Sequence, residues 1–214
     1  MYMRKLVFLV IFAFMLTGCT RVTDNFDEIV NATMSKEKTS VNTVSTGYEL
    51  YIPTGVMQVS DNEYNQKFRI KDRNVYLYVD TISYYYRNIL NYKEENDYNY
   101  YYKKLEFKDK VGYIGINKNS DDEFFCEIVY NYSKIEFYSD LYNLPIILAN
   151  SLIIQNSIKY DDSLIRLELD SMVNDGREVK FELDKPKESE STFDKYLQEY
   201  VVNETADVVL PDED

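Results

Sequence analysis

Short segments in which apolar and polar residues alternate make up most of the chain after Gly47. A period of two puts every second side chain on the same face, as in a β-strand with one buried face. The clearest segment is 75–80, where Val75, Leu77 and Val79 share one face. The same pattern predicts strands over 48–53, 56–59, 65–70, 105–107, 111–116, 124–130 and 134–138. Turn-forming residues separate these segments, so we expect an antiparallel meander.

The segment 84–102 is rich in tyrosine and contains a polar stretch at 93–97. Tyrosine is a good strand former, because its ring packs well on a pleated and half-buried surface. We therefore expect strands in both flanks of this segment and a loop between them.

One long helix is expected after the meander. Asn143 can cap its amino end, Pro145 suits the first turn, and Asp140 favours a helix amino end through its charge. Its apolar side is formed by Ile146, Ile147, Ala149, Ile153, Ile154 and Ile158.

Two further elements follow from weaker patterns. A short helix over 24–32 has Asp24 as its expected cap and an apolar side formed by Phe26, Ile29 and Val30. Alternation in 164–169 and 179–183 around Asn174-Asp175-Gly176 predicts a hairpin. A helix over 163–173 is the alternative for the first of these segments.

These elements predict an α+β fold, in which a long carboxy-side helix packs on an antiparallel sheet. The expected organisation is a signal peptide at 1–18, a polar tether with a short helix at 19–46, a globular domain at 47–185 and an acidic tail at 186–214. The tail is rich in acids and in residues that form no core, so we expect it to be flexible at its end.

The order of elements over 47–160, which opens with the strand and turn Tyr48-Glu-Leu-Tyr-Ile-Pro-Thr-Gly55, resembles the PsbP-like superfamily. That group includes photosystem accessory proteins, a Ran-binding import factor and many small bacterial lipoproteins. The resemblance implies an α/β sandwich that acts as a binding or assembly module. It assigns no functional residue to this chain, and it does not extend to 163–214.

The amino terminus has a different pattern. Arg4 and Lys5 precede an uninterrupted apolar run over 6–16, which is shorter than the roughly 20 residues that a membrane-spanning helix needs. Leu16-Thr17-Gly18-Cys19 follows, and it resembles the lipobox of bacterial lipoproteins. The resemblance implies cleavage before Cys19 and a lipid anchor on the thiol of Cys19. Two acyl chains give a durable anchor, whereas one gives marginal binding.

Composition excludes several classes of function. The net charge of −13 argues against nucleic acid as a partner, because phosphates would repel the chain. The chain contains no histidine, which excludes catalytic triads that use imidazole and zinc sites with imidazole ligands. Cys126 lies in the apolar run 124–129, so we interpret it as a buried structural cysteine.

Acidic residues gather in two expected turns, Asp61-Asn62-Glu63 and 119–123. Carboxylates are calcium ligands, but neither segment has the EF-hand sequence or its glycine. Solvated turns explain both, so we expect no metal and no cofactor. A hydrolase that uses carboxylates alone would need two close acids, one of them with a raised pKa.

The tyrosine-rich segment offers the best candidate contact surface. Tyrosine combines a rigid apolar ring with a polar tip, which suits a protein or glycan surface in water. The proposed contact residues are Tyr84, Tyr86, Tyr98, Tyr100 and Tyr102.

The sequence therefore predicts a lipoprotein on the extracytoplasmic face of the cell membrane, anchored at Cys19. We expect a non-enzymatic module that binds or assembles another protein of the cell envelope. The alternative is a lipoprotein that captures a glycan, a peptide or a cation.

Overall fold

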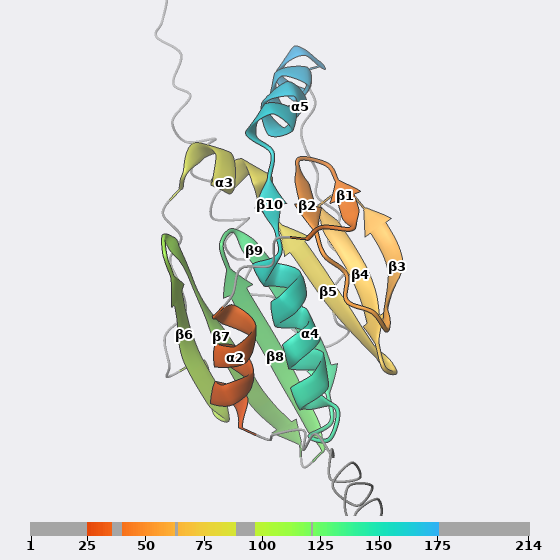
Figure 1. Cartoon of the computed structure of the whole chain (residues 1–214), viewed down its shortest axis with the longest axis vertical. Helices are drawn as coiled ribbons and strands as arrows, with labels where there is room; N and C mark the ends of the chain where they lie inside the picture. The colour runs from red at the N-terminus through yellow and green to blue at the C-terminus, as the bar shows by residue number, and fades with distance from the viewer. Residues whose placement is uncertain (1–24, 36–39, 63, 89–96, 121, 176–214) are drawn as a thin grey trace, which may run out of the picture.

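The computed structural model describes residues 25–35, 40–62, 64–88, 97–120 and 122–175. These residues form an α+β fold with antiparallel sheets and few helices (Figure 1), as the sequence predicts at this level. The expected signal peptide, the lipobox with Cys19, the expected strand at 179–183 and the acidic tail at 186–214 lie outside the described residues. Among the described helices, none is long and apolar enough to cross a membrane.

A seven-stranded antiparallel sheet forms the centre of the fold, with the order β3-β4-β5-β9-β8-β7-β6. The strands are β3 (Val56–Asn62), β4 (Asn65–Ile70), β5 (Arg73–Val79), β6 (Tyr101–Phe107), β7 (Lys110–Ser120), β8 (Glu123–Tyr130) and β9 (Ser133–Ser139). Two meanders, β3-β4-β5 and β6-β7-β8-β9, join where β5 pairs with β9. The expected strands in these regions are confirmed.

A second sheet brings distant parts of the chain together. It has three strands in the order β1-β2-β10, with β1 at Thr43–Ser45, β2 at Tyr48–Leu50 and β10 at Lys159–Tyr160. Next to it, the backbone N–H of Tyr51 donates to Ser157 Oγ at 2.8 Å, across 106 residues of sequence. The turn after β2 contains Gly55 with a φ of 88°, a conformation that favours glycine.

Helix α4 (Leu144–Asn156) lies over one face of the seven-stranded sheet, beside α2 (Phe26–Met34). α4 begins at the expected position, with Pro145 in its first turn. The side chain of Asn143 does not cap it, because its amide donates to Asp140 Oδ2 at 2.8 Å instead. Ile158 lies beyond the end of this helix.

The short helix α2 is confirmed, but two expectations about its surroundings are wrong. Asn25 caps it, because its Oδ1 accepts from the backbone N–H groups of Asp27 and Glu28. The segment is also no simple tether, because Ile29 and Val30 are buried in the core next to α4. The folded unit therefore begins before residue 47.

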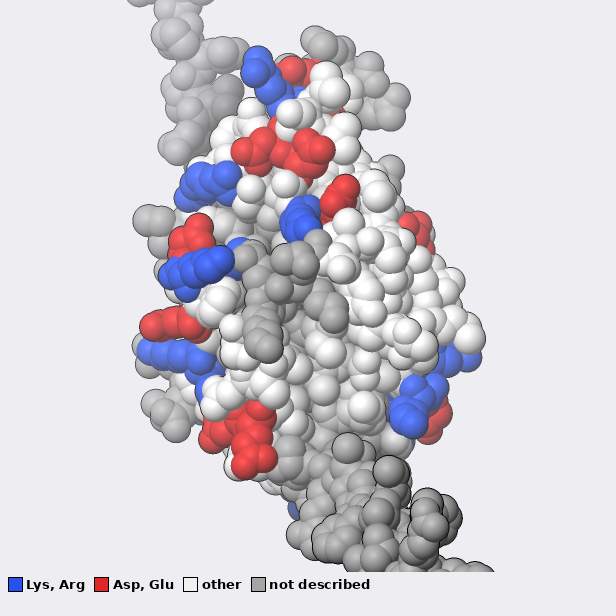
Figure 2. Space-filling model, in the orientation of Figure 1, with Lys and Arg blue, Asp and Glu red and all other residues white. Residues whose placement is uncertain are grey.

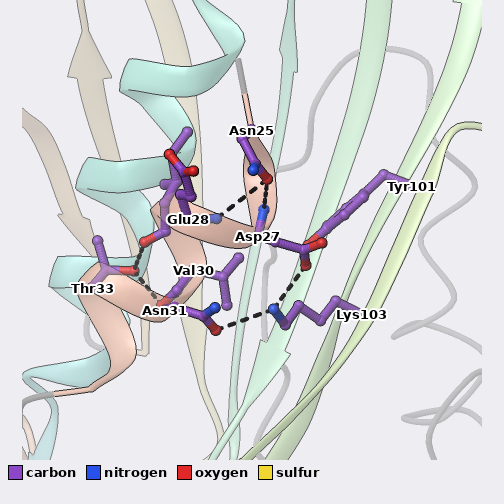
Figure 3. Close-up of polar contacts among 9 residues, drawn as sticks. Asn25, Asp27, Glu28, Val30, Asn31, Thr33, Tyr101 and Lys103 are labelled. Atoms are coloured by element: carbon purple, nitrogen blue, oxygen red, sulfur yellow. Dashed lines mark hydrogen bonds and ion pairs between the residues drawn. The ribbon is translucent and has the colours of Figure 1, made fainter. Parts of the chain in front are cut away.

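Polar contacts fasten α2 to the edge strand β6 (Figure 3). Asp27 Oδ1 accepts from the Tyr101 hydroxyl at 2.9 Å and from Lys103 Nζ at 2.8 Å. Lys103 Nζ also donates to Asn31 Oδ1 at 3.2 Å. These contacts fix the helix relative to the edge of the sheet.

Two expected strands are helices. Tyr84 to Tyr86 belong to α3 (Thr81–Tyr86), which begins where Asp80 Oδ1 accepts from the backbone N–H of Ser83 at 2.8 Å. Residues 164–169 belong to α5 (Asp162–Asp175), at whose start Asp161 Oδ1 accepts from the backbone N–H groups of Ser163 and Leu164. A capping aspartate outweighs the strand propensity in both places, and the helical alternative for 163–173 is correct.

Candidate functional site

The two faces of the seven-stranded sheet have different side chains. One face carries Leu77, Ile114, Ile128 and Ile135, which are buried in one core with α2 and α4. The other face, called the far face here, carries the alternate residues. Strand pairing sets Glu127 directly opposite Glu136, and it sets Val129 opposite Lys134.

A buried ionic network lies on the far face. Lys134 Nζ is 3.0 Å from Glu127 Oε2 and 2.5 Å from Glu136 Oε1. The side chain of Lys134 is 4% exposed and that of Glu127 is 1% exposed, so both charges are almost completely removed from water. One lysine thus forms ion pairs with two carboxylates in the protein interior, where an unpaired charge is strongly unfavourable.

Two tyrosines complete the network. The hydroxyls of Tyr98 and Tyr113 both donate to Glu127 Oε1, at 2.6 and 2.7 Å. With Lys134 on its other oxygen, Glu127 has three charge-assisted partners.

The pKa values in this network follow from burial and from neighbouring charge. Burial raises the pKa of Glu136; the positive charge of Lys134 opposes this effect, and the negative charge of Glu127 adds to it. Burial also raises the pKa of Tyr98 and Tyr113, and the charge of Glu127 raises both further. Both tyrosines are therefore protonated donors near neutral pH.

Gly115 makes room for Tyr98 over the sheet. A Cβ atom at position 115 would lie 2.1 Å from the ring of Tyr98. The Tyr98 ring stacks on Tyr102 with centroids 5.7 Å apart, and Tyr102 stacks on Tyr113 at 6.0 Å. Two of the expected contact residues, Tyr98 and Tyr102, thus belong to an aromatic cluster around Glu127.

The other three expected contact residues lie elsewhere. Tyr100 packs against Phe26 and Phe124, and Phe124 belongs to the core on the α2 side. Tyr84 in α3 stacks on Tyr160 with centroids 3.7 Å apart, while Tyr86 is exposed. The five tyrosines therefore form no single surface, and their role in binding remains a prediction.

The acidic turns and Cys126 are the remaining candidates from the sequence. Asp61 is expected in a turn but lies in β3, where the Ser45 hydroxyl donates to its Oδ1 at 3.5 Å. Glu63 and Asp121 lie outside the described residues. No group of three or more metal-ligating side chains occurs among the residues that the structure describes. Cys126 is a free and fully buried thiol whose pKa is raised by burial, which confirms its structural interpretation.

A second candidate site lies where the two sheets end side by side, at β1 and β3. Each of these strands pairs on one side only within the described part of the chain. Val44 on β1 and Met57 and Val59 on β3 are exposed apolar side chains of these two edge strands, and we call the three residues the edge patch. Val44 belongs to the outer face of the small sheet, whereas Met57 belongs to the far face, because its neighbour Gln58 pairs with the core residue Phe68. Figure 2 shows a broad area largely without charged side chains over β1 and β3, at the right of the view.

Sequence patterns did not reveal either candidate site in full. Lys134-Ile135-Glu136 has the alternation of a strand with one face in water, yet both polar residues are buried. The available signal was a set of charged residues on strands that the meander places at the centre of the sheet. The edge patch depends on β1, a short strand that the polar composition of 20–46 did not predict.

Comparison with known proteins gives little further information. No protein-family model matches the chain, and no curated protein is significantly similar to it. A crystal structure of a Bacteroides thetaiotaomicron protein is similar, with 12% sequence identity and a TM-score of 0.37. The match covers 83% of this chain and 65% of that protein, so this chain spans less than two thirds of its length. At this level the likeness bears on neither fold nor function.

Proposed function

We propose that this protein is a lipoprotein of the extracytoplasmic membrane face, anchored at Cys19, and that it binds another protein of the cell envelope without catalysing a reaction. The lipobox at 16–19 supports the anchor. The edge patch is the observation that carries the partner-binding role.

The edge patch has the properties of a protein contact. It consists of three exposed apolar side chains on edge strands, in a largely uncharged part of a chain with a net charge of −13. Edge strands present backbone N–H and C=O groups, to which an extended segment of a partner can add as a further strand. A register shift between Gln58 and Ser60 interrupts β3, and such bulges limit indiscriminate pairing of edges.

The relationship with the PsbP-like superfamily belongs to this proposal. An antiparallel sheet with α4 across one face supports it, and a role in binding or assembly is what the resemblance implies.

The anchor is tested with a Cys19→Ala variant. We expect the wild-type chain to incorporate labelled fatty acid and to shorten by the signal peptide, whereas the variant stays unlabelled and uncleaved. Normal labelling of the variant would refute the anchor.

The partner is tested by crosslinking in cells, followed by capture of the membrane-anchored protein and mass spectrometry. Val59→Lys places a charge in the edge patch, and Val111→Lys is a matched control, because both valines are 44% exposed. We expect one or two envelope proteins to be enriched with wild type and with Val111→Lys, and to be lost with Val59→Lys. Equal enrichment with both variants would remove the edge patch from the proposal.

Capture of a small ligand is the second candidate, and the aromatic cluster around Glu127 favours it. Glu127 and Lys134 are themselves buried, but the half-buried rings of Tyr98 and Tyr102 stack beside them and offer an aromatic surface. The test is thermal unfolding of the purified protein with glycans, peptides or cations, in parallel with Glu127→Gln. Stabilisation of the wild type alone would favour this function, and no stabilisation by any of them would count against it.

The carboxylate hydrolase is the third possibility, and the far face meets part of its requirement. Glu127 and Glu136 are close, and the pKa of Glu136 is raised. Lys134 bridges them and all three are buried, which is the arrangement of a structural ion network. We therefore propose no catalytic role for the pair.

A further inference from the structure

The folded unit begins very close to the expected anchor. Asn25, the cap of α2, follows Cys19 by six residues of the sequence. A chain of this length reaches at most about 20 Å, even when it is fully extended. If Cys19 carries the lipid, the end of the domain that holds Asn25 must therefore lie near the bilayer.

The same end of the domain also carries the start of α4. Asn156, at the carboxyl end of α4, donates from Nδ2 to the backbone carbonyl of Thr33 near the carboxyl end of α2, at 3.2 Å. The two helices thus run in parallel, and their amino ends lie together at the lower end of Figure 1. Ring contacts from Phe26 to Tyr100 and from Tyr100 to Phe124 continue across this end.

A turn between β9 and α4 projects two apolar side chains from this end. Tyr142 is 89% exposed and Leu141 is 49% exposed. The turn is held in place by Asp140, which accepts from the backbone N–H of Asn143 at 2.9 Å and from Arg73 at 3.0 Å. The exposure of Leu141 and Tyr142 is therefore fixed by the polar contacts beneath them.

We propose that this end of the domain rests on the membrane, with Leu141 and Tyr142 in the lipid–water interface. The inference rests on the lipid anchor of the proposed function. Tyrosine suits this position, because its ring prefers the apolar side of the interface and its hydroxyl the wet side. The strongly acidic chain is repelled by anionic headgroups, so the contact is apolar and suits neutral phospholipid.

The contacts of α2 with β6 fix how the sheet is oriented relative to the membrane. Asp27 is held by both Tyr101 and Lys103 of β6 (Figure 3), so the start of the helix is fixed relative to the sheet. The sheet then extends away from the membrane. β7 has 11 residues, which at about 3.3 Å per residue gives a length of about 36 Å. Helix α3 lies at the opposite end, where the backbone N–H of Asp80 donates to the carbonyl of Tyr132 at 2.8 Å.

The chain contains no tryptophan, so a single introduced tryptophan is a specific fluorescent probe. Tyr142→Trp places the probe at the proposed interface. Tyr86→Trp in α3 places it at the far end on a side chain that is 60% exposed, which makes it the matched control. Each full chain is made in a bacterium, extracted from its membranes and reconstituted in phosphatidylcholine vesicles that contain brominated lipid.

We expect the Tyr142→Trp protein to be quenched severalfold more strongly than the Tyr86→Trp protein and to emit at shorter wavelength. Equal quenching of the two probes, with both proteins floating with the vesicles, would overturn the orientation and leave the anchor intact. Protein that carries no lipid by mass and does not float would overturn the anchor, and the orientation with it.

Discussion

Both faces of the seven-stranded sheet contain buried side chains at its centre, but these are buried by different means. Under α2 and α4, Ile114, Ile128 and Ile135 exclude water without any directional requirement. On the far face, Glu127, Lys134 and Glu136 are buried because each charge has a partner. An apolar face tolerates small changes of shape, whereas an ionic face depends on every member of the set.

The two faces also differ in how much they contribute to the stability of the fold. Apolar burial is the main source of stability in a domain of this size. A buried ionic network contributes little net stability, because desolvation offsets the attraction between the charges. The far face therefore contributes a specific arrangement of side chains, including the position of Tyr98, more than it contributes stability.

The largest expected effect is that of Lys134→Met. This variant leaves Glu127 and Glu136 facing each other without a cation, and removal of one partner of a buried ion pair costs about 4 kcal/mol. The free energy of unfolding in urea measures the loss. The triple variant with Glu127→Gln and Glu136→Gln should recover much of it, and a triple variant as unstable as Lys134→Met alone would show that the charges are not the cause.

A smaller loss is expected from Ile128→Ala, which lies in β8 on the face opposite Glu127. Truncation of a fully buried isoleucine costs about 3 kcal/mol, through lost burial and the cavity that remains. This loss should be the same at every pH at which the protein folds, because no charge is involved. A strong pH dependence would mean that the two faces are coupled through β8.

Glu136→Gln tests the pH dependence of the far face. The pKa of Glu136 is raised above its ordinary value of 4.5, so the folded state binds this proton more tightly than the unfolded state does. Protonated Glu136 therefore makes its full contribution to the free energy of unfolding at a pH below 4.5. This contribution is lost as the pH rises through the pKa of Glu136 in the folded state. The stability of wild type relative to Glu136→Gln should fall as the pH rises from about 4 to about 8. Parallel unfolding curves over this range would contradict the raised pKa.

The smallest effect is expected from Asp27→Asn, which removes a similar ion pair from an exposed place. The Asp27 side chain is 61% exposed, and exposed pairs gain little in water. We expect no measurable change in the melting temperature. A loss comparable to that of Lys134→Met would show that the contacts of α2 with β6 matter more for stability than burial indicates.

The apolar face could be predicted from the sequence, whereas the far face could not. Val75, Leu77 and Val79 alternate with tyrosines, and this period of aliphatic residues locates a buried face regardless of what covers it. On the far face Lys134 and Glu136 have the same alternation as a solvated face. Their ion pairs join β8 and β9, and Tyr98, a partner of Glu127, comes from outside both strands, so no local pattern contains the network.

The two helices that were predicted as strands have one common cause. Strand propensity of Tyr84 to Tyr86 and alternation in 164–169 were outweighed by Asp80 and Asp161, which cap α3 and α5. A capping residue determines a helix start through a few specific hydrogen bonds, while propensity acts weakly at each position. In α2 the helix itself was predictable, but its place in the core was not, because a polar stretch surrounds it.

The three-stranded sheet has a consequence for the order in which the protein folds. β10 pairs with β2, and the contact of Tyr51 with Ser157 spans 106 residues of sequence. Closing so long a loop is entropically unfavourable before the intervening strands have formed, so this contact belongs to the late stages of folding. A chain that emerges from its amino end can pair β2 with β1, but the other edge of β2 has no partner strand until residue 160 is available. Interactions that form late slow unfolding and leave the folding rate almost unchanged. The small sheet therefore lowers the unfolding rate of a fold that the larger sheet establishes first.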